Sequence, residues 1–375
     1  MRIATEIGWG HKTGGARRVA FRVLQEIAAL RPSYQLPVYC NTFQQGLAGT
    51  TAIEQQVLSC PASIPQTVWD QFIFPHWAVP RSNRLQKPDL IHHTNNMVSF
   101  FGHTPVVVTI HDMTPFLIPE TFRCLHGFYQ RAYFRYAAQK AARIITVSES
   151  SKRDICRILG VVEERVTVAP LAVDQEALTP PGQEARQAYF AEQGIDQPFI
   201  LYVGAIHPRK NLGRIIGAFA NLKKEKGIPH KLVIVGAKRW MADKLFAGVD
   251  CQAIVDQLIF PGVVDDRDLA SLYAGCDAFV WPSLYEGFGL PILEAMHCGA
   301  PVITSNCSSM PGVAADAALL VDPTKQQEIQ EALWKVLDDR SFAQELAKKG
   351  RKRAAEFSWR KTAEIVLKVY EEILL

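Results

Sequence analysis

The sequence lacks the cysteine patterns that mark a metal site or a disulfide scaffold. Its eight cysteines are scattered, with no CxxC pair and no cluster with histidine at the spacing of a zinc site. A chain of 375 residues can bury a core without disulfide staples, and scattered cysteines are typical of a reducing compartment. These absences predict a protein without a metal site, in the cytoplasm.

Long hydrophobic runs and a strong net charge are missing as well. No apolar run approaches the ~20 residues of a membrane span, and the first ten residues lack the basic and apolar regions of a signal peptide. The net charge of +4 does not indicate a nucleic-acid partner. Residues 1–173 nevertheless hold 18 Lys and Arg against 11 Asp and Glu, a net +7. This basic half predicts an anionic partner or peripheral contact with a membrane surface, unless the charges are simply solvated.

What the sequence does contain is an alternation of short apolar runs with helical patterns. Runs rich in Val and Ile that show little alternation fit parallel strands buried on both faces. We expect strands at 106–110, 143–147, 199–203, 231–235, 258–261, 278–281, 301–304 and 318–321. Helices are expected between them, at 211–226, 266–274 and about 291–298. The repetition of strand, helix and strand predicts an α/β protein with doubly wound parallel sheets.

Segment 169–198 interrupts the alternation, because it contains four prolines and no apolar strand pattern. Such a stretch is typical of a linker between domains, here with a preparatory helix. We therefore predict two Rossmann-like domains, 1–172 and 173–355, that face each other across a cleft, followed by a helix within 356–375. An apolar stripe predicts that this last helix is amphipathic, with Ser358 as its cap. Ligands are expected in the cleft, at the carboxyl ends of the strands.

The segment GAIHPRKNL, 204–212, joins a predicted strand to a predicted helix. Gly204 ends the strand, so Arg209 and Lys210 lie at its carboxyl end and beside a helix N-terminus. Two adjacent cations next to a helix dipole suit a diphosphate. A solvated basic turn is the alternative.

The segment SLYEGFGLPILEAMHCGAPVIT, 283–304, places glutamates on both sides of a glycine-rich turn. Its proline and its last glycine fit the two ends of a helix, which puts Glu286 in the preceding loop and Glu294 on the first helical turn. Gly287 and Gly289 allow backbone N–H groups to approach a ligand closely. Carboxylates that flank such an anion site are suited to sugar hydroxyls. A plain loop–helix joint with solvated charges is the alternative.

A third glycine turn, Gly14 and Gly15 in HKTGGARRVA, follows the first predicted strand and is expected at the same kind of edge. It lacks the lysine and the spacing of a Walker A loop, and GxGxxG is absent from the sequence. ATP chemistry and hydride transfer therefore lose support.

Histidines follow two of the strands in the first half. His111 stands at the carboxyl end of the strand at 106–110, where it can bind a substrate or transfer a proton, unless it is only structural. His92 and His93 follow another short strand and are expected to line the cleft. No convincing spacing of three metal ligands emerges among these residues.

Aromatic and basic side chains interleave along residues 122–143. The pattern predicts a helix with an aromatic side and a basic side, which is suited to an anionic membrane surface. Packing of the aromatic side in the core, with solvated arginines, is the favoured interpretation.

Together these motifs resemble those of glycosyltransferase family 4, retaining enzymes with the GT-B fold. The resembling stretches are the strand followed by His-Asp, VSESSKRDI, VAPLAVD, LYVGAIHPRKNL, FPGVVDDRDLASLYAGCDAFVWPSLYEGFGLPILEAMHCGAPVITSN and ALLVDP. They span nearly the whole chain and are most specific over 199–323. The resemblance implies an acceptor-binding first domain, a second domain that binds a nucleotide sugar, and a last helix that crosses back onto the first. It also implies hexose transfer from a nucleotide-diphosphate sugar to a glycan or lipid-linked glycan, without metal or further cofactor.

The resemblance assigns roles to individual residues. Glu286 matches the residue beside the donor sugar, and Glu294 matches the one that holds the ribose hydroxyls. Arg209 and Lys210 match the cations that bind the diphosphate, and His111 matches a residue that contacts the transferred sugar. The other matched positions approach the phosphates, the sugar or the nucleotide base; they are Gly14, Gly15, Gly204, Gly287, Phe288, Gly289, Leu290, Val263, Val264 and Leu269.

One position departs from the family pattern, since Ala205 stands where many members have an arginine. Either Arg209 and Lys210 alone supply the charge, or the sugar preference differs. UDP-glucose is the favoured donor and GDP-mannose the next. The alternative functions are a sugar-nucleotide epimerase of similar fold and a non-catalytic subunit that binds nucleotide sugars.

Overall fold

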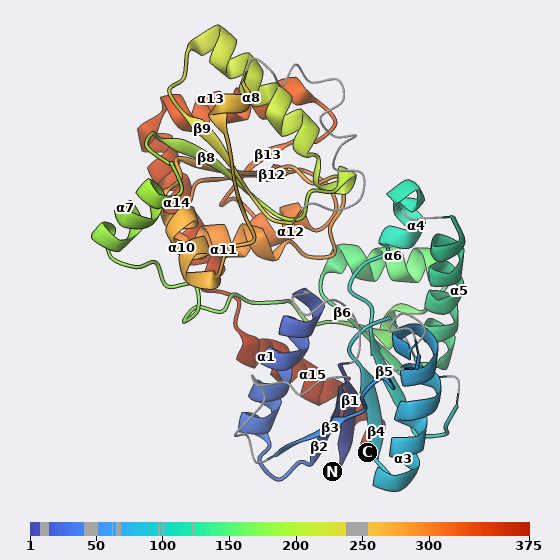
Figure 1. Ribbon diagram of the computed structural model, residues 1–375. Coiled ribbons are helices and arrows are strands. Elements are labelled where there is room, and N and C mark those ends of the chain that lie inside the picture. The colour runs from blue at the N-terminus through green and yellow to red at the C-terminus, as the bar shows by residue number, and fades with distance from the viewer. Residues whose placement is uncertain are drawn as a thin grey trace. The chain divides into compact units, whose positions relative to one another are not determined.

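The computed structural model describes residues 1–7, 15–40, 52–61, 63–64, 69–96, 98–99, 101–121, 124–237 and 254–375. They form two compact units, Met1–Leu171 with Ser358–Leu375 (unit 1) and Ala172–Phe357 (unit 2). Each unit has one sheet, and all strand pairs within both sheets are parallel (Figure 1). The predicted α/β class with two Rossmann-like sheets is confirmed.

Unit 1 has seven strands in the order β3-β2-β1-β4-β5-β6-β7. They are β1 (Ile3–Glu6), β2 (Leu36–Cys40), β3 (Ile53–Val57), β4 (Leu90–His93), β5 (Val106–Thr109), β6 (Arg143–Thr146) and β7 (Val166–Val168). The order changes direction between β1 and β4, so that these two strands start the two halves of the sheet. In doubly wound sheets, ligands bind at the carboxyl ends of the strands beside this switch point.

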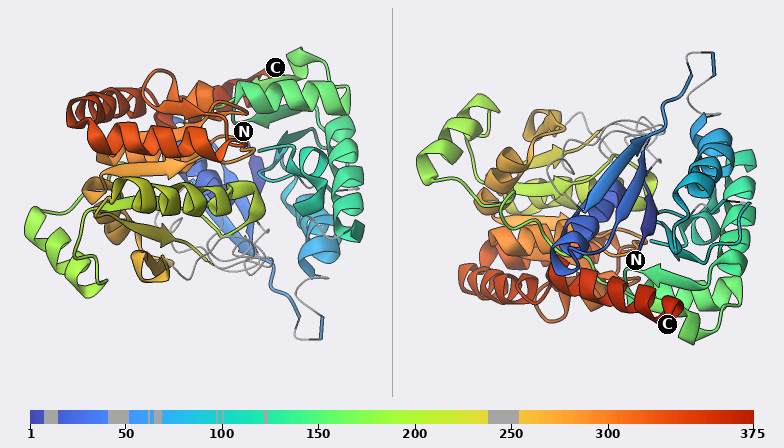
Figure 2. Two further views of the ribbon diagram at one scale, coloured as in Figure 1. Left: turned by 90° about the horizontal axis from the view of Figure 1, so that it is seen from above. Right: turned by 90° about the horizontal axis from the view of Figure 1, so that it is seen from below.

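The helices of unit 1 pack on both faces of its sheet. Among the described residues, they are α1 (Gly15–Leu30), α3 (Val79–Gln86), α4 (Thr114–Leu117), α5 (Cys124–Lys140), α6 (Glu149–Leu159) and α15 (Trp359–Leu374), with a π-helix η2 (Trp69–Ala78) and 3-10 turns η3 (Pro119–Thr121) and η4 (Glu163–Arg165). Helices α1 and α15 lie side by side, as both Figure 1 and the right-hand view of Figure 2 show. Ser358 caps α15 as predicted, since its side chain accepts a hydrogen bond from the N–H of Lys361.

Helix α5 packs in the core, which was the favoured interpretation of its sequence. Tyr133 and Phe134 are buried. Two of its basic side chains bind neighbouring backbone, because Arg131 donates to the carbonyl of Pro115 at 3.2 Å and Lys140 to that of Gly102 at 3.1 Å. Over the described parts of the chain, no helix has the length and apolar character needed to cross a bilayer.

His92 is the third residue of β4 and connects elements of the fold; whether it also lines a ligand cleft, as the sequence suggested, stays a prediction. Its Nδ1 atom lies 2.6 Å from the hydroxyl of Tyr370 on α15, and its Nε2 atom lies 2.8 Å from Oγ1 of Thr109 on β5. Burial, with a smaller effect of the neighbouring histidines His93 and His111, lowers the pKa of His92 to about 3. The neutral ring therefore links α15 to the sheet of unit 1.

Unit 2 has six strands in the order β10-β9-β8-β11-β12-β13. They are β8 (Phe199–Val203), β9 (Lys231–Val235), β10 (Leu258–Gly262), β11 (Ala278–Trp281), β12 (Val302–Ser305) and β13 (Leu319–Val321). Each of the six begins and ends within one residue of its predicted bounds. The prediction is accurate because these strands are short, continuous apolar runs, most of them buried on both faces.

Helices cover both faces of this second sheet. In the part of unit 2 that the structure describes, they are α7 (Gln183–Glu192), α8 (Leu212–Lys226), α10 (Asp266–Gly275), α11 (Leu290–Cys298), α12 (Met310–Ala314), α13 (Gln326–Asp338) and α14 (Arg340–Ala354), with 3-10 turns η5 (Pro208–Lys210) and η7 (Val255–Gln257). Figure 1 shows α8 and α13 on one side of the strands and α10 and α11 on the other. The predicted helix at 211–226 starts one residue later, because Asn211 has a left-handed backbone, with φ of 63°.

Candidate active site

Glu286 is held between two cations in unit 2. Its Oε2 atom lies 2.9 Å from Nη1 of Arg209, and its Oε1 atom lies 2.6 Å from Nζ of Lys210. The cations belong to η5, which follows β8, and the glutamate belongs to the loop that follows β11. Because β8 and β11 are neighbouring parallel strands, their carboxyl ends bring the two loops together. The sequence predicted each residue at such an edge, but not that they bind one another.

The carboxyl group of Glu286 is ionised in this arrangement. Burial alone would raise its pKa, but the charges of Lys210 and Arg209 outweigh burial and hold the pKa below the ordinary glutamate value. Its side chain is only 9% exposed, so the carboxylate depends on these two partners. A diphosphate that binds Arg209 and Lys210 must therefore share them with Glu286 or displace it.

Two serines after β12 hold the backbone of this loop. Ser308 Oγ donates to the carbonyl of Glu286 at 2.7 Å and accepts from its N–H at 3.1 Å. Ser309 Oγ lies 2.9 Å from the same carbonyl and 2.6 Å from that of Phe288. Sequence reasoning missed both serines. The available signal was SNCSSM at 305–310, a group of small hydroxyl residues directly after a buried strand.

Trp281 supports the second cation, and sequence reasoning missed it as well. The Nζ atom of Lys210 lies 4.2 Å from the centroid of the Trp281 ring, a cation–π contact. The indole is fully buried at the end of β11, where its N–H donates to the carbonyl of Val203 at 2.8 Å. Arg209 has its own anchor, a 2.8 Å hydrogen bond from Nη1 to the carbonyl of Tyr285. Both cations are therefore held in place by groups besides Glu286.

Glycine is required where the backbone turns around this site. A Cβ atom on Gly236, just after β9, would lie 2.1 Å from the carbonyl oxygen of Gly204, just after β8. Gly289 has φ of +111°, which L side chains rarely adopt. The turn that begins at Gly287 leads directly into α11, which starts at Leu290. Its backbone therefore lies before a helix N-terminus, as predicted.

Glu294 lies on the second turn of α11 rather than on the first, because the helix already begins at Leu290. The hydroxyl of Tyr273, on α10, donates to Oε2 of Glu294 at 3.1 Å. Tyr273 is fully buried, and burial, with the added effect of Glu294, raises its pKa well above the ordinary tyrosine value. The tyrosine therefore remains a neutral donor that orients the carboxylate of Glu294. The sequence offered no spacing that links the two residues.

The other predicted donor contacts in unit 2 differ in exposure. Phe288 is buried, with its ring centroid 5.9 Å from that of Phe357, so a ligand would meet its backbone rather than its ring. Val263 is 70% exposed in the turn after β10. The neighbouring positions Val264 and Leu269 are half-buried.

In unit 1, His111 follows β5 and is neutral. Burial lowers its pKa, against the opposing effects of the Thr94 carbonyl and Asp112. Its Nε2 donates to that carbonyl at 3.1 Å, so the lone pair of the neutral ring is on Nδ1. Gly15 is the exposed first residue of α1, and Gly14 lies outside the described residues.

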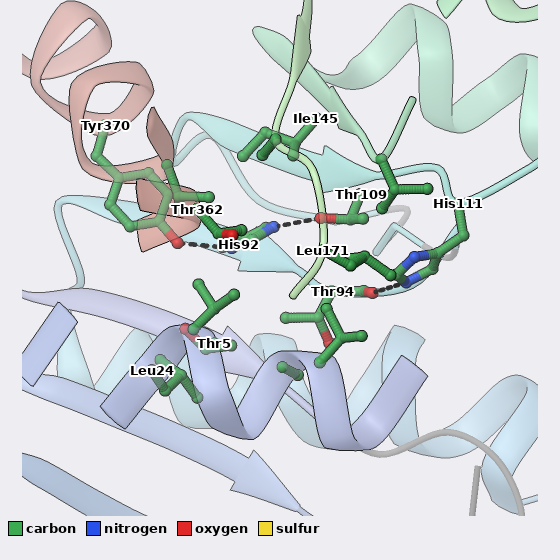
Figure 3. Close-up of a pocket in the computed structure, with 16 residues that line it drawn as sticks. Thr5, Leu24, His92, Thr94, Thr109, His111, Ile145, Leu171, Thr362 and Tyr370 are labelled. Atoms are coloured by element: carbon green, nitrogen blue, oxygen red, sulfur yellow. Dashed lines mark hydrogen bonds between the residues drawn. The ribbon is translucent and has the colours of Figure 1, made fainter. Parts of the chain in front are cut away.

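His111 also lines a pocket between the sheet, α1 and α15 of unit 1 (Figure 3). The space measures about 440 Å³, part of it open to solvent. Aliphatic side chains such as Val23, Leu24 and Ile145 form much of its wall. A pocket of this character does not suit a charged diphosphate. Among the described residues, no three His, Cys, Asp or Glu side chains are grouped to hold a metal ion.

Comparison with known families and proteins agrees with this geometry. The description "Glycosyltransferase Family 4" matches residues 13–177, and "Glycosyl transferases group 1" matches residues 185–353. The two matches together cover most of both units.

Similar proteins include O-antigen chain mannosyltransferase B of Escherichia coli, which is 32% identical over 76% of this chain and 74% of its own length. The serotype-specific mannosyltransferase WbdA of the same species is 29% identical over 76% of this chain, but the match spans only 37% of WbdA. Among solved structures, sucrose-phosphate synthase from Thermosynechococcus elongatus has the same fold, with a TM-score of 0.79, 21% identity and coverage of 99% of this chain and 98% of that one. The chain therefore belongs to glycosyltransferase family 4 and has the GT-B fold.

Proposed function

We propose that this glycosyltransferase is a retaining hexosyltransferase that transfers mannose from GDP-mannose to a glycan or lipid-linked glycan. We favour GDP-mannose over UDP-glucose, the donor favoured by the sequence alone, because both relatives named above are mannosyltransferases. The observation that supports donor binding in unit 2 is the placement of Arg209 and Lys210 around Glu286 at the carboxyl ends of β8 and β11.

The proposed reaction breaks the bond between the anomeric carbon and the diphosphate oxygen. Negative charge then grows on the diphosphate, and Arg209, Lys210 and the N–H groups before α11 stabilise it without a metal ion or other cofactor. The sugar gains oxocarbenium character. The acceptor hydroxyl attacks on the face from which the diphosphate leaves, and its proton passes to the leaving phosphate oxygen. Anomeric configuration is retained, and charge and atoms balance.

The other residues position the two substrates. In this proposal Glu286 and His111 contact the transferred sugar, while Glu294 accepts hydrogen bonds from the ribose hydroxyls. The turn Gly287–Leu290 offers its backbone to the phosphates, and Val263 contacts the base. Unit 2 holds the donor and unit 1 holds the acceptor.

A panel of nucleotide sugars tests the donor. Each compound is added to the purified full chain, and the melting temperature is measured, because a ligand that binds the folded state raises it by mass action. We expect GDP-mannose and GDP to give the largest shifts. Arg209→Ala and Lys210→Ala should each remove most of the shift. Lys224→Ala is their control for the loss of a positive charge, since Lys224 is an exposed residue of α8. A larger shift with UDP-glucose would transfer the assignment to that donor.

Incubation of the donor without acceptor separates the alternative functions. Slow release of free mannose fits a transferase, because water replaces the acceptor. Conversion of GDP-mannose into an epimeric nucleotide sugar would instead identify an epimerase. Tight donor binding without turnover, unchanged by Glu286→Gln, would identify a non-catalytic subunit.

We further propose that unit 1 contacts a membrane surface on its cytoplasmic side when the acceptor is lipid-linked. Its net positive charge and the exposed Phe128 on α5, 70% accessible, support this contact. Co-sedimentation with vesicles that contain anionic lipid tests it. Binding to those vesicles, its absence with neutral vesicles and its weakening by Phe128→Ala are expected. Equal binding to both kinds of vesicle would contradict the electrostatic argument.

A further inference from the structure

An acid–histidine pair lies buried at the carboxyl edge of the unit 1 sheet, outside the residues that the proposed reaction uses. Glu6 is the last residue of β1 and His93 the last residue of β4, and the two are direct partners in the register of these strands. Glu6 Oε2 is hydrogen-bonded to Nδ1 of His93. The residues are 4% and 1% exposed. They stand beside the switch point of the sheet, where doubly wound folds bind ligands.

Each member of the pair has a second polar atom that the described residues do not satisfy. These atoms are Oε1 of Glu6 and Nε2 of His93, and both are buried. Buried polar atoms in folded proteins are nearly always hydrogen-bonded to protein, water or ligand. The pair is therefore suited to a polar partner from outside the described fold.

The chemistry of the pair restricts the class of partner. In the neutral form of the ring, the Nδ1–H of His93 donates to Oε2 of Glu6, and Nε2 carries the lone pair. Both unsatisfied atoms, Oε1 of Glu6 and Nε2 of His93, are then hydrogen-bond acceptors. Two neighbouring acceptors bind hydroxyl donors but offer no hydrogen to phosphate oxygens, so the site does not suit the diphosphate of the donor.

Thr94 connects the pair to His111. Its Oγ1 donates to the carbonyl of Glu6 at 2.8 Å, and its own carbonyl accepts from Nε2 of His111 at 3.1 Å. Figure 3 shows the bond between Thr94 and His111, with His92 bonded to Tyr370 and Thr109. Because side chains alternate along a strand, His93 lies on the opposite face of β4 from His92. His92 therefore bonds to Tyr370 and Thr109, whereas His93 pairs with Glu6.

We propose that Glu6 and His93 form a subsite of unit 1 that binds hydroxyl groups of the sugar acceptor. This inference rests on the proposed function, because a hydroxyl-bearing acceptor is its ligand. A desolvated pair of acceptors discriminates strongly against an analogue that lacks the matching hydroxyl, since the protein atoms are then left unpaired. The pair is thus a determinant of acceptor specificity, separate from the cations that bind the donor.

Binding of methyl α-D-mannopyranoside and methyl α-D-glucopyranoside to the full chain, with GDP present, tests the proposal by saturation-transfer NMR. The variants are Glu6→Gln and His93→Gln. The matched control is His92→Gln, which changes the neighbouring histidine on the other face of the same strand. We expect at least one glycoside to bind the wild type and the control, and to bind both pair variants at least tenfold more weakly. The thermal shift with GDP stays the same in all four proteins.

Three results would overturn the subsite: no binding of either glycoside to the wild type, binding that survives in a pair variant, or an equal loss in the control or in GDP binding. If a pair variant does not fold, Glu6→Asp replaces it, because the shorter side chain keeps the carboxyl group but moves its oxygens away from His93. Failure of the proposed function has a different signature, namely no shift with any nucleotide sugar and no transfer product. The two failures are therefore distinguishable.

Discussion

Lys210 and Glu286 are joined by a hydrogen-bonded ion pair of 2.6 Å, although 76 residues separate them in the sequence. Arg209 binds the other carboxylate oxygen at 2.9 Å. The positive charge of the proposed diphosphate site is therefore partly neutralised by the residue that is proposed to contact the donor sugar. Removal of the carboxylate and removal of the cations should have opposite effects on nucleotide binding.

Glu286→Gln should separate binding from turnover. The substitution leaves Arg209 and Lys210 available to phosphate, so GDP affinity should stay the same or increase. Turnover should fall by about 100-fold, the usual cost of losing a preorganised polar contact in an active site. Calorimetric titration with GDP and a transfer assay with GDP-mannose measure the two quantities.

Glu294→Gln is the comparison for Glu286→Gln. It should affect nucleotide binding more than turnover. Its main effect should be weaker GDP binding, by about tenfold, because a hydrogen bond to a charged group contributes about 1.5–3 kcal/mol. The proposed roles would be refuted if the two variants lowered nucleotide affinity equally.

Arg209→Ala and Lys210→Ala should each remove most of the thermal shift that GDP produces. Either change alone leaves Glu286 with one cation, but the double substitution leaves a carboxylate that is 9% exposed without a charged partner. Removal of the partner of a buried charge costs about 3–5 kcal/mol. The double variant should therefore lose more unfolding free energy than the sum of the single variants, as measured in urea.

Addition of Glu286→Gln to the double variant is the control for this ion pair. The third substitution removes the unpaired charge, so it should restore part of the lost stability. If it lowers stability further, Glu286 is stabilised mainly by groups other than the two cations.

Tyr273→Phe should weaken recognition of the ribose while leaving the fold intact, because the ring keeps its contact with Phe279, 5.3 Å between centroids. The variant loses the donor that orients Glu294. GDP should bind several-fold more weakly to the variant than to the wild type. The affinity for 2′-deoxy-GDP should change less, because that compound offers one hydroxyl fewer to Glu294.

Tyr189→Phe is the matched control, because it also removes one tyrosine hydroxyl from unit 2 but lies on α7. It should leave the ratio of GDP to 2′-deoxy-GDP affinities unchanged. An equal loss for both nucleotides in Tyr273→Phe would point to general damage rather than to the position of Glu294.

Unit 1 should become less stable in acid because of His92. Its pKa is lowered from 6.5 to about 3 in the folded protein, so the unfolded chain takes up a proton at a pH where the folded one does not. Stability is therefore present above pH 6.5 and falls as the pH decreases toward 3, by up to about 1.4 kcal/mol per pH unit. Urea unfolding of the wild type at pH 7, 6 and 5 measures the slope.

His92→Gln should reduce that slope, although it lowers stability at pH 7 through the loss of hydrogen bonds to Tyr370 and Thr109. Two other histidines of unit 1 with lowered pKa values, His76 and His111, keep part of the acid sensitivity. An unchanged slope would show that His92 does not contribute to it.

The fold of unit 2 could be predicted from the sequence almost strand by strand, whereas in unit 1 the bounds of only two strands were predicted, 106–110 and 143–147, which match β5 and β6. Strands such as β8, FILYV, are short, continuous apolar runs rich in β-branched and aromatic residues, which is typical of a doubly buried strand. By contrast, β3 reads IEQQV and lies at the edge of its sheet, so its polar residues hide the pattern. The π-helix η2 contains a proline and has no regular periodicity to recognise.

The residue types of the candidate site were predictable, but their partners were not. Arg209, Lys210 and Glu286 were expected at strand ends, because that position follows from a single strand and the turn after it. The bonds of Glu286 to the cations and of Glu294 to Tyr273 join different loops and helices. Such contacts depend on strand order and side-chain direction, which local sequence patterns do not contain. The same reason explains why Ser308, Trp281 and the pairing of Glu6 with His93 were missed.

The bond between His92 and Tyr370 has a consequence for how the protein is made. It joins residues 278 positions apart, and α15 packs against α1 in the same unit. During synthesis, the whole of unit 2 leaves the ribosome before the helix that completes unit 1. The second unit can therefore reach its native state first, while the nascent first unit still exposes the apolar side chains of α1 and its sheet. The part of the chain that is translated first is the last to become complete, and a chaperone that binds apolar surface would act there.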